Sequence, residues 1–337
     1  SKKIIDYKVN NLHILNYSIP QNKKIKKKDL LAKLFYLENY TDAIPYVTSY
    51  YKKNWGFCVT KKQYDQIDKK YKNSDTFSVK ISSSFNKNGN LHYGELLIPG
   101  KSKKEILLST YICHPSMANN EISGPVVTTF LALWLSGIKR KYTYRIIFVP
   151  ETIGSITYLS KNLNHMKRNT IAGFNITCVG DERIYSYLPT RDGNTLVDRV
   201  IKNVLKSHCQ EYIEYSWLDR GSDERQYNSP GIDIPVASIM RSKYGSYPEY
   251  HTSLDNLSLI TSEGLNGSYE AIKKSIKIIE ENEIYVINVL GEPQLGKRKL
   301  YSNLSSVKTS KKFKSILDFL TYCDGMNDLL SISDNSV

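Results

Sequence analysis

Hydrophobic runs of strand length alternate with longer amphipathic stretches over the central part of the chain. The strand-like runs lie at residues 105–110, 144–149, 174–179 and 235–240, and the helical stretches lie at 124–137, 155–164, 195–206 and 262–281. Strands separated by helices are typical of a mostly parallel sheet with helices on its faces. We therefore predict an α/β domain over residues 101–291 and expect the loops after its strands to share one edge of the sheet.

The first hundred residues carry a different pattern. Residues 12–18 alternate like a short strand, 21–28 are interpreted as a basic linker, and helices are predicted at 29–37 and 61–70. Strands are predicted at 44–51 and 55–60, and a β-hairpin is predicted from the runs 76–83 and 91–98 around the Asn-rich turn at Gly89. This segment is thus expected to form a small β-rich domain.

The C-terminal part has its own elements. A strand is predicted at 284–290, followed by a Ser/Lys linker, an amphipathic helix that begins at Phe313 and stops at Gly325, and the start of a second helix at 329–332.

Composition and charge bear on the location of the protein and on its partners. The chain has no apolar run long enough to cross a membrane and no apolar signal segment near Ser1. Its five cysteines show no CxxC pair or disulfide spacing, which favours a reducing, cytoplasmic location. The net charge of +14 comes mainly from Lys in loop-like stretches, so we interpret it as solvated surface, and nucleic-acid binding is not the favoured function.

Polar residues that can do chemistry follow the predicted strands. His114 and Asn120 follow the first strand, Glu151 follows the second, Asp181 follows the third and His251 lies beyond the fourth. Imidazole nitrogen and carboxylate oxygen are zinc ligands, and a nearby Glu can act as a general base. Other interpretations stay open: Asn120 can cap a helix, Glu151 can be a charge in a first helical turn, and Asp181 can pair with a neighbouring Arg.

Further residues of these loops are candidates for substrate binding. They are Arg220, Asp223, Arg241 and Tyr250. Arginine in such a loop can hold a carboxylate or a phosphate, or it can be a plain surface charge. Ser116 and Ser222 lack the pattern of a nucleophile elbow, which argues against a serine hydrolase.

Four motifs occur in a fixed order along the chain: CHPS followed by SG at 113–124, PETIGS at 150–155, SDERQY at 222–227 and YHTSLD at 250–255. Together they resemble a bacterial family of aminopeptidase-like proteins associated with polysaccharide biosynthesis, a divergent branch of the zinc aminopeptidases. The resemblance implies an α/β three-layer sandwich with a mixed, mostly parallel sheet. It also implies a first catalytic segment at 1–16, an inserted small β-rich domain at 17–100, and a linker with a partial winged helix at 292–337. Family members extend beyond both ends, so we expect this chain to be truncated.

The resemblance also implies roles for individual residues. His114 and His251 match metal ligands and Glu151 matches the general base. Asn120 falls where the pattern has an Asp that bridges two metals, and Asp181 is the candidate for a further ligand. Because an amide is a weaker ligand than a carboxylate, we expect one zinc ion, or none, and not two.

The function expected from these observations is zinc-dependent hydrolysis of an amide or peptide bond, with an aminoacyl or acylamino sugar as a candidate substrate. A non-catalytic binding or scaffold relative is the alternative, and nucleic-acid binding is a weaker one. The expected partner is a small molecule or peptide, with no membrane, and self-association into a homo-oligomer stays open.

Overall fold

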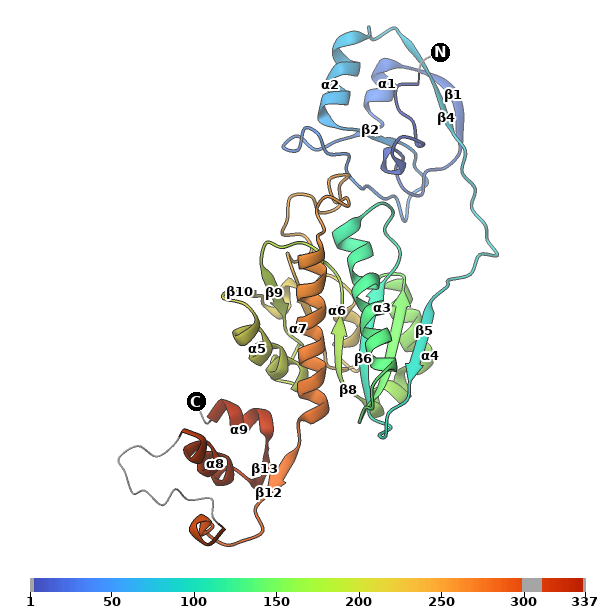
Figure 1. Ribbon diagram of the computed structural model, residues 1–337. Coiled ribbons are helices and arrows are strands. Elements are labelled where there is room, and N and C mark those ends of the chain that lie inside the picture. Colours follow the sequence, from blue (N-terminus) through green and yellow to red (C-terminus); the bar gives the residue numbers. More distant parts are fainter. Residues whose placement is uncertain (1–2, 299–310, 336–337) are drawn as a thin grey trace.

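The computed structural model describes residues 3–298 and 311–335, and the Ser/Lys linker predicted after residue 298 lies largely outside them. A seven-stranded mixed sheet forms its centre (Figure 1). The strand order is β10 (Tyr212–Glu214), β9 (Tyr185–Leu188), β11 (Val236–Met240), β8 (Thr170–Asn175), β6 (Glu105–Tyr111), β7 (Thr143–Val149) and β5 (Gly94–Ile98). Only the pairs β11–β9 and β5–β7 are antiparallel, so the sheet is mostly parallel, as predicted.

Helices cover both faces of this sheet. On one face lie α3 (Ser123–Ser136), α5 (Leu196–His208) and α7 (Ser262–Glu281), and on the other lie α4 (Ile153–Asn169) and the short α6 (Glu224–Tyr227). Each face has its own hydrophobic core: Leu131 and Ile276 belong to the first, and Tyr158 and Met166 to the second. Strand β6 lies between the two cores and is buried along its whole length, which explains the consecutive apolar residues at 106–108. The predicted three-layer α/β sandwich is confirmed.

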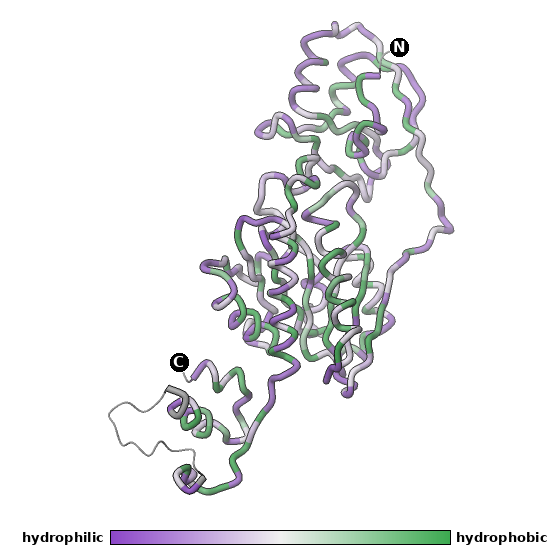
Figure 2. The backbone as a smooth tube through the Cα atoms, viewed as in Figure 1, coloured by the Kyte–Doolittle hydropathy of each residue, from purple (hydrophilic) through white to green (hydrophobic). Residues whose placement is uncertain are grey.

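The N-terminal module, residues 3–81, packs at one end of this domain (Figure 1). Its elements are η1 (Asn11–His13), β1 (Gln21–Lys26), α1 (Lys27–Leu31), β2 (Leu34–Phe35), β3 (Phe57–Cys58), α2 (Lys61–Lys70) and β4 (Thr76–Ile81). A small core that includes Trp55, Ile67 and Val79 holds it together. Figure 2 shows its two helices as mostly hydrophilic, whereas hydrophobic residues gather along the central sheet. The predicted helix 61–70 is confirmed and begins with a capping box at Thr60.

Several predicted elements in the first hundred residues are wrong. Strand β4 pairs with β1, which occupies the predicted basic linker, and β5 joins the main sheet beside β7, so the predicted hairpin does not form. Helix α1 ends at Leu31, and the predicted strand 44–51 makes only isolated bridges at Pro45 and Thr48. Strands β4 and β5 both pair with strands that are distant in sequence, so the turn at Gly89 does not determine the pairing.

The C-terminal segment forms a separate unit from β12 (Ile284–Val286), η4 (Leu295–Arg298), α8 (Lys311–Thr321), β13 (Asp324–Asp328) and α9 (Leu329–Asn335). Strands β12 and β13 pair antiparallel. The unit contacts α5 through Arg199, which donates to both carboxylate oxygens of Asp328 at 3.0 and 2.5 Å. In the described ranges, 3–298 and 311–335, no helix has the length and apolar character needed to cross a membrane.

Candidate metal centre

His114 follows β6 in the loop predicted to carry the first ligand. Its Nε2 lies 3.7 Å from Oε2 of Glu151, and its Nδ1 lies 3.1 Å from Oε2 of Glu121. Sγ of Cys113 is also close to Nδ1, at 3.3 Å. Burial by itself lowers the pKa of His114, but the hydrogen bonds to Cys113 and Glu121 and the charge of Glu151 outweigh it and raise the pKa to about 10. The structure therefore brings His114 and Glu151 together, as predicted, and adds two neighbours.

Glu121 is one of these additional neighbours, and a turn of π-helix, η2 (Ala118–Ile122), places it there. The backbone N–H groups of Ala118, Asn119 and Asn120 donate to the carboxylate of Asp255 at 3.1, 2.6 and 3.0 Å. These bonds satisfy the free donors at the start of the turn. Single π-turns inside helices often mark functional sites. Sequence reasoning missed Glu121, because only the wider turn brings its side chain to His114.

Asn120 points to a different side of the turn. Its Nδ2 donates to the hydroxyl of Tyr111 at 2.7 Å, and its Oδ1 is buried without a hydrogen-bond partner in the described part of the chain. The ring of Tyr111 lies 5.5 Å from the ring of His114. Buried oxygens normally accept a hydrogen bond, so Oδ1 of Asn120 is an acceptor that is available to a ligand.

His251 lies beside His114, with ring centroids 5.0 Å apart. It has a positive φ of 55° and stacks on Tyr250 at 3.9 Å. Burial, and then the charge of His114, lower the pKa of His251 to about 4, so its ring is neutral at neutral pH. Its Nε2 is buried and unpaired among residues 3–298 and 311–335.

The N-terminal module covers the two imidazoles. The ring of Tyr46 lies 5.5 Å from that of His114 and 5.3 Å from that of His251. Its backbone N–H donates to the carbonyl of His251 at 2.8 Å. No local pattern identifies Tyr46, because the contact joins segments far apart in sequence.

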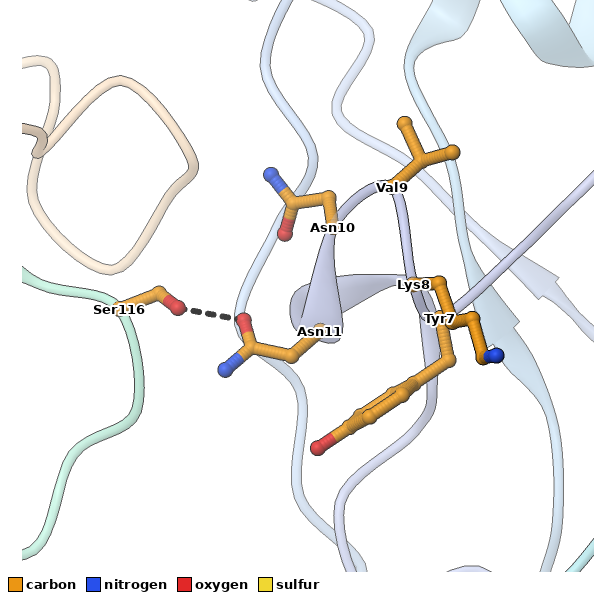
Figure 3. Close-up of a pocket in the computed structure, with 6 residues that line it drawn as sticks. All are labelled: Tyr7, Lys8, Val9, Asn10, Asn11 and Ser116. Carbon is orange, nitrogen blue, oxygen red and sulfur yellow. Dashed lines mark hydrogen bonds between the residues drawn. The ribbon is translucent and has the colours of Figure 1, made fainter.

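A second contact with the module lies at the outer end of the His114 loop. Ser116, at φ 58°, donates to Oδ1 of Asn11 (Figure 3). A cavity of about 420 Å³ opens there between the N-terminal segment around Tyr7 and Ser116. The module therefore contacts this loop at two residues, His114 and Ser116.

Glu151 follows β7 and is presented by a strained turn. Thr152 has φ 63° and ψ −67°, and the N–H of Ile153 donates to the carbonyl of Glu151 at 2.7 Å. This is a γ-turn of the rare, strained type, which costs about 1–3 kcal/mol. Two bonds hold it: the N–H of Thr152 donates to Oδ1 of Asp223 at 2.6 Å, and Arg225 donates to the Thr152 hydroxyl at 2.7 Å. Burial raises the pKa of Glu151, and the charge of His114 partly offsets this effect.

Asp181 lies in a different environment from the one predicted. One of its carboxylate oxygens accepts from Nδ2 of Asn119 and the N–H of Ser242, and the other from the N–H of Arg183 and the hydroxyl of Ser242. Among the described residues, a group of at least three His, Cys, Asp or Glu side chains whose ligand atoms all lie within 4.8 Å of one another is formed by Cys113, His114 and Glu121. The geometry thus gives Asp181 a structural role, and its part as a ligand stays a prediction.

The predicted substrate-binding residues divide into two groups. Tyr250 stacks on His251, and buried Asp223 supports the Glu151 turn, so both belong to the site. Burial, and then the charge of Glu151, raise the pKa of Asp223 to about 7. The second group is the two arginines, whose guanidinium groups pack on aromatic rings. That of Arg220 lies 5.1 Å from the ring of Trp217, and that of Arg241 lies 4.0 Å from the ring of Tyr185.

The donor set fits one metal ion. His114 and His251 offer imidazoles, and Nε2 of His251 and Oδ1 of Asn120 are buried atoms without partners in the structure as described. Imidazole is a common zinc ligand. By the resemblance described above, Asn120 falls where the zinc aminopeptidase pattern has an Asp that bridges two metals, so a second ion would lack that carboxylate.

Comparisons with known proteins place the chain in a family. Residues 2–282 match a family described as a domain of unknown function (DUF4910), and residues 283–336 match a winged helix-turn-helix family. A relative from Clostridium acetobutylicum, named as a polysaccharide biosynthesis protein with an aminopeptidase-like domain, is 44% identical over 99% of this chain and 76% of its own length.

Solved structures agree on the fold. The crystal structure of a C. acetobutylicum protein described as a peptidase matches 100% of this chain and 75% of its own, with a TM-score of 0.89 and 42% identity. A zinc aminopeptidase from Bacillus subtilis matches 79% of this chain and 78% of its own, with a TM-score of 0.58 and 14% identity, which shows the fold alone. The chain belongs to the DUF4910 family and has an aminopeptidase-like fold followed by a winged helix.

Proposed function

We propose that the protein is a zinc-dependent hydrolase of amide bonds. His114 and His251 would hold one ion through their Nε2 atoms, with Oδ1 of Asn120 as a third, weaker donor and Glu151 as the general base. The observation that carries the proposal is the unpaired, buried Nε2 of His251 beside a second imidazole. Such a nitrogen costs free energy unless a ligand pairs with it.

The charges around the pair support this arrangement. The low pKa of His251 keeps its lone pair free. Oε2 of Glu151 lies 3.7 Å from Nε2 of His114, so this carboxylate could reach a water molecule bound beside that nitrogen. A bound zinc ion would supply Lewis-acid polarisation of the substrate carbonyl.

Proton transfer would fall to Glu151. Its raised pKa makes it a better base than an exposed carboxylate, so it would take a proton from the attacking water and return it to the leaving amine. The γ-turn at Thr152 fixes this carboxylate in place before substrate binds.

The substrate class is the least determined part of the proposal. The name of the relative from C. acetobutylicum links it to polysaccharide biosynthesis, and we propose an aminoacyl or acylamino sugar as the substrate. Tyr250 and the neighbouring Tyr46 would line the side of the site where such a substrate enters. A reducing, cytoplasmic setting is proposed from the five free cysteines.

The test combines metal analysis with a variant of the base. Protein purified without chelator should hold about one zinc per chain, and Glu151→Gln should lose at least about 100-fold in kcat on aminoacyl substrates while it still binds zinc. The exposed Glu182→Gln is the matched control and should keep full activity. Wild-type protein that neither binds zinc nor hydrolyses any of a panel of aminoacyl and acylamino sugars would sink the proposal.

A binding protein without catalysis is the second candidate. Asn120 favours it, because the resemblance places it where the zinc aminopeptidase pattern has a bridging Asp. In that case substrate analogues would bind with the same affinity to wild type and Glu151→Gln, and neither would turn over.

A further inference from the structure

We propose that Glu121 is a positioning residue that holds the Nδ1 side of His114 and thereby leaves Nε2 free for the metal. The inference rests on the proposed function, since it concerns the same site. It assigns a role to a carboxylate that the sequence did not single out. It also explains how a site with Asn at position 120 keeps a negative charge next to its imidazole ligand.

The geometry of the pair is direct. Nδ1 of His114 lies 3.1 Å from Oε2 of Glu121, and the two side chains are only 8% and 10% exposed. An ionised carboxylate can only accept, so the nitrogen that faces it must carry the proton. When the ring gives up its second proton to bind a metal ion, the lone pair is then on Nε2, the atom that faces Glu151. Partners of this kind fix the orientation of metal-binding His and raise its basicity.

The backbone explains why Glu121 and not Asn120 takes this place. Asp255 binds the N–H groups of Asn119 and Asn120, and Nδ2 of Asn120 is tied to Tyr111. The following residue of the π-turn, Glu121, is the one whose carboxylate reaches Nδ1 of His114. Its carboxylate contacts Nδ1 of His114 and so leaves Nε2 of the same ring available for a metal ion.

Cys113 shares in this arrangement. Its Sγ lies 3.3 Å from Nδ1 of His114 and accepts the N–H of Glu151 at 3.2 Å. The thiol therefore links the ligand loop to the turn of the base. Thiol, imidazole and carboxylate together could also hold an ion directly, because their ligand atoms lie within 4.8 Å of one another. We favour the positioning role, since Nδ1 is already bonded and the imidazole of His251, whose Nε2 has no partner in the described part of the chain, lies beside His114.

The first experiment compares zinc affinity by calorimetry in wild type, Glu121→Gln and Glu121→Asp. Glu121→Gln keeps the shape but can turn its amide NH₂ toward Nδ1, which favours the tautomer with the proton on Nε2. We expect a loss of 10–100-fold in affinity, the range seen when such partners of metal-binding His are removed, and partial recovery in Glu121→Asp. Equal affinity in wild type and Glu121→Gln would overturn the inference.

A second readout does not need metal. NMR of the metal-free protein should show a low-field proton on Nδ1 of His114 that is lost in Glu121→Gln and Glu121→Ala, with unchanged thermal unfolding in Glu121→Gln. A proton unaffected by both variants would contradict the inference. Absence of zinc binding in wild type would instead defeat the proposed function, so the two failures are distinct.

The third experiment separates positioning from direct ligation. Cobalt-substituted protein should lack a thiolate-to-metal charge-transfer band, and Cys113→Ser should bind zinc with nearly wild-type affinity. A charge-transfer band that disappears in Cys113→Ser would place the ion on the Nδ1 side and overturn the positioning role of Glu121.

Discussion

The imidazole rings of His114 and His251 lie 5.0 Å apart at an interplanar angle of 39°. Their electrostatic environments differ. A carboxylate lies near each ring nitrogen of His114, whereas Nε2 of His251 has no partner in the described part of the chain. Burial beside a charged His114 keeps His251 neutral. A buried ring nitrogen without a partner is unfavourable, and under the proposed function a metal ion between the rings would be that partner.

Removal of His251 should therefore abolish stabilisation by metal. Zinc at about 100 times its Kd should stabilise wild type by about 2.7 kcal/mol, since it binds only the folded state. His251→Ala should show no shift of Tm on zinc addition. The exposed His92→Ala should respond like wild type. A full zinc shift in His251→Ala, measured by scanning calorimetry, would remove His251 from the site.

The strained turn at Thr152 should trade stability for activity. Gly adopts positive φ without a steric cost, so Thr152→Gly should relieve strain and raise the free energy of unfolding by about 1 kcal/mol, even after loss of the hydroxyl bonded to Arg225. Because Glu151 is then no longer held in one position, kcat should fall several-fold. Urea unfolding and steady-state kinetics test both parts, and a less stable Thr152→Gly protein would contradict the strain argument.

Asp255 should be the main support of the π-turn. Its carboxylate accepts from Ala118, Asn119, Asn120 and the hydroxyl of Tyr247. Asp255→Asn would direct an amide NH₂ toward N–H donors and leave buried groups unpaired, at a cost of about 3 kcal/mol. Denaturant unfolding measures this loss, and the exposed Asp29→Asn serves as control. A change below about 0.5 kcal/mol would show that the turn holds its shape without Asp255.

The C-terminal unit should separate from α5 at low pH. Hydrogen bonds from Arg199, against the opposing effect of burial, hold the pKa of Asp328 well below its ordinary value of 3.8. Because the folded pKa is the lower one, the contact is fully stabilising above about pH 4 and weakens as the pH falls through the folded value.

Hydrogen exchange in α9 and in the face of α5 near Arg199 should therefore rise below pH 4 in wild type. Asp328→Asn should show the faster exchange already at pH 7, with little further change in acid. Equal protection in wild type and Asp328→Asn at pH 7 would mean that other contacts hold the unit.

Much of the central domain was determined by the sequence itself. The apolar run at 105–110 predicts β6, and the periodic stretch at 262–281 predicts α7, because strands buried on both faces and long helices carry strong local signals. The prediction for β8 was displaced: the strand ends at Asn175, and the apolar residues after it are buried in a loop. The short strands β9 and β10 were missed, since three or four residues carry little periodicity.

The order of the motifs along the chain also predicts that His114, Glu151 and His251 share one site. In the fold, His114 lies within 3.7 Å of Glu151 and its ring lies 5.0 Å from that of His251. This part of the site is predictable because each of the three residues belongs to a short motif in a loop of the same α/β domain.

Tertiary structure decided what motif order could not. The pairing of β1 with β4 depends on distant partners and not on the turn at Gly89. Whether position 120 or 121 faces His114 depends on the π-turn and on Asp255, which lies far away in the chain. Tyr46 and the bonds that occupy Asp181 are also long-range contacts. Sequence periodicity reports which face of an element is buried, but the direction of one side chain in a loop depends on the groups that satisfy its backbone.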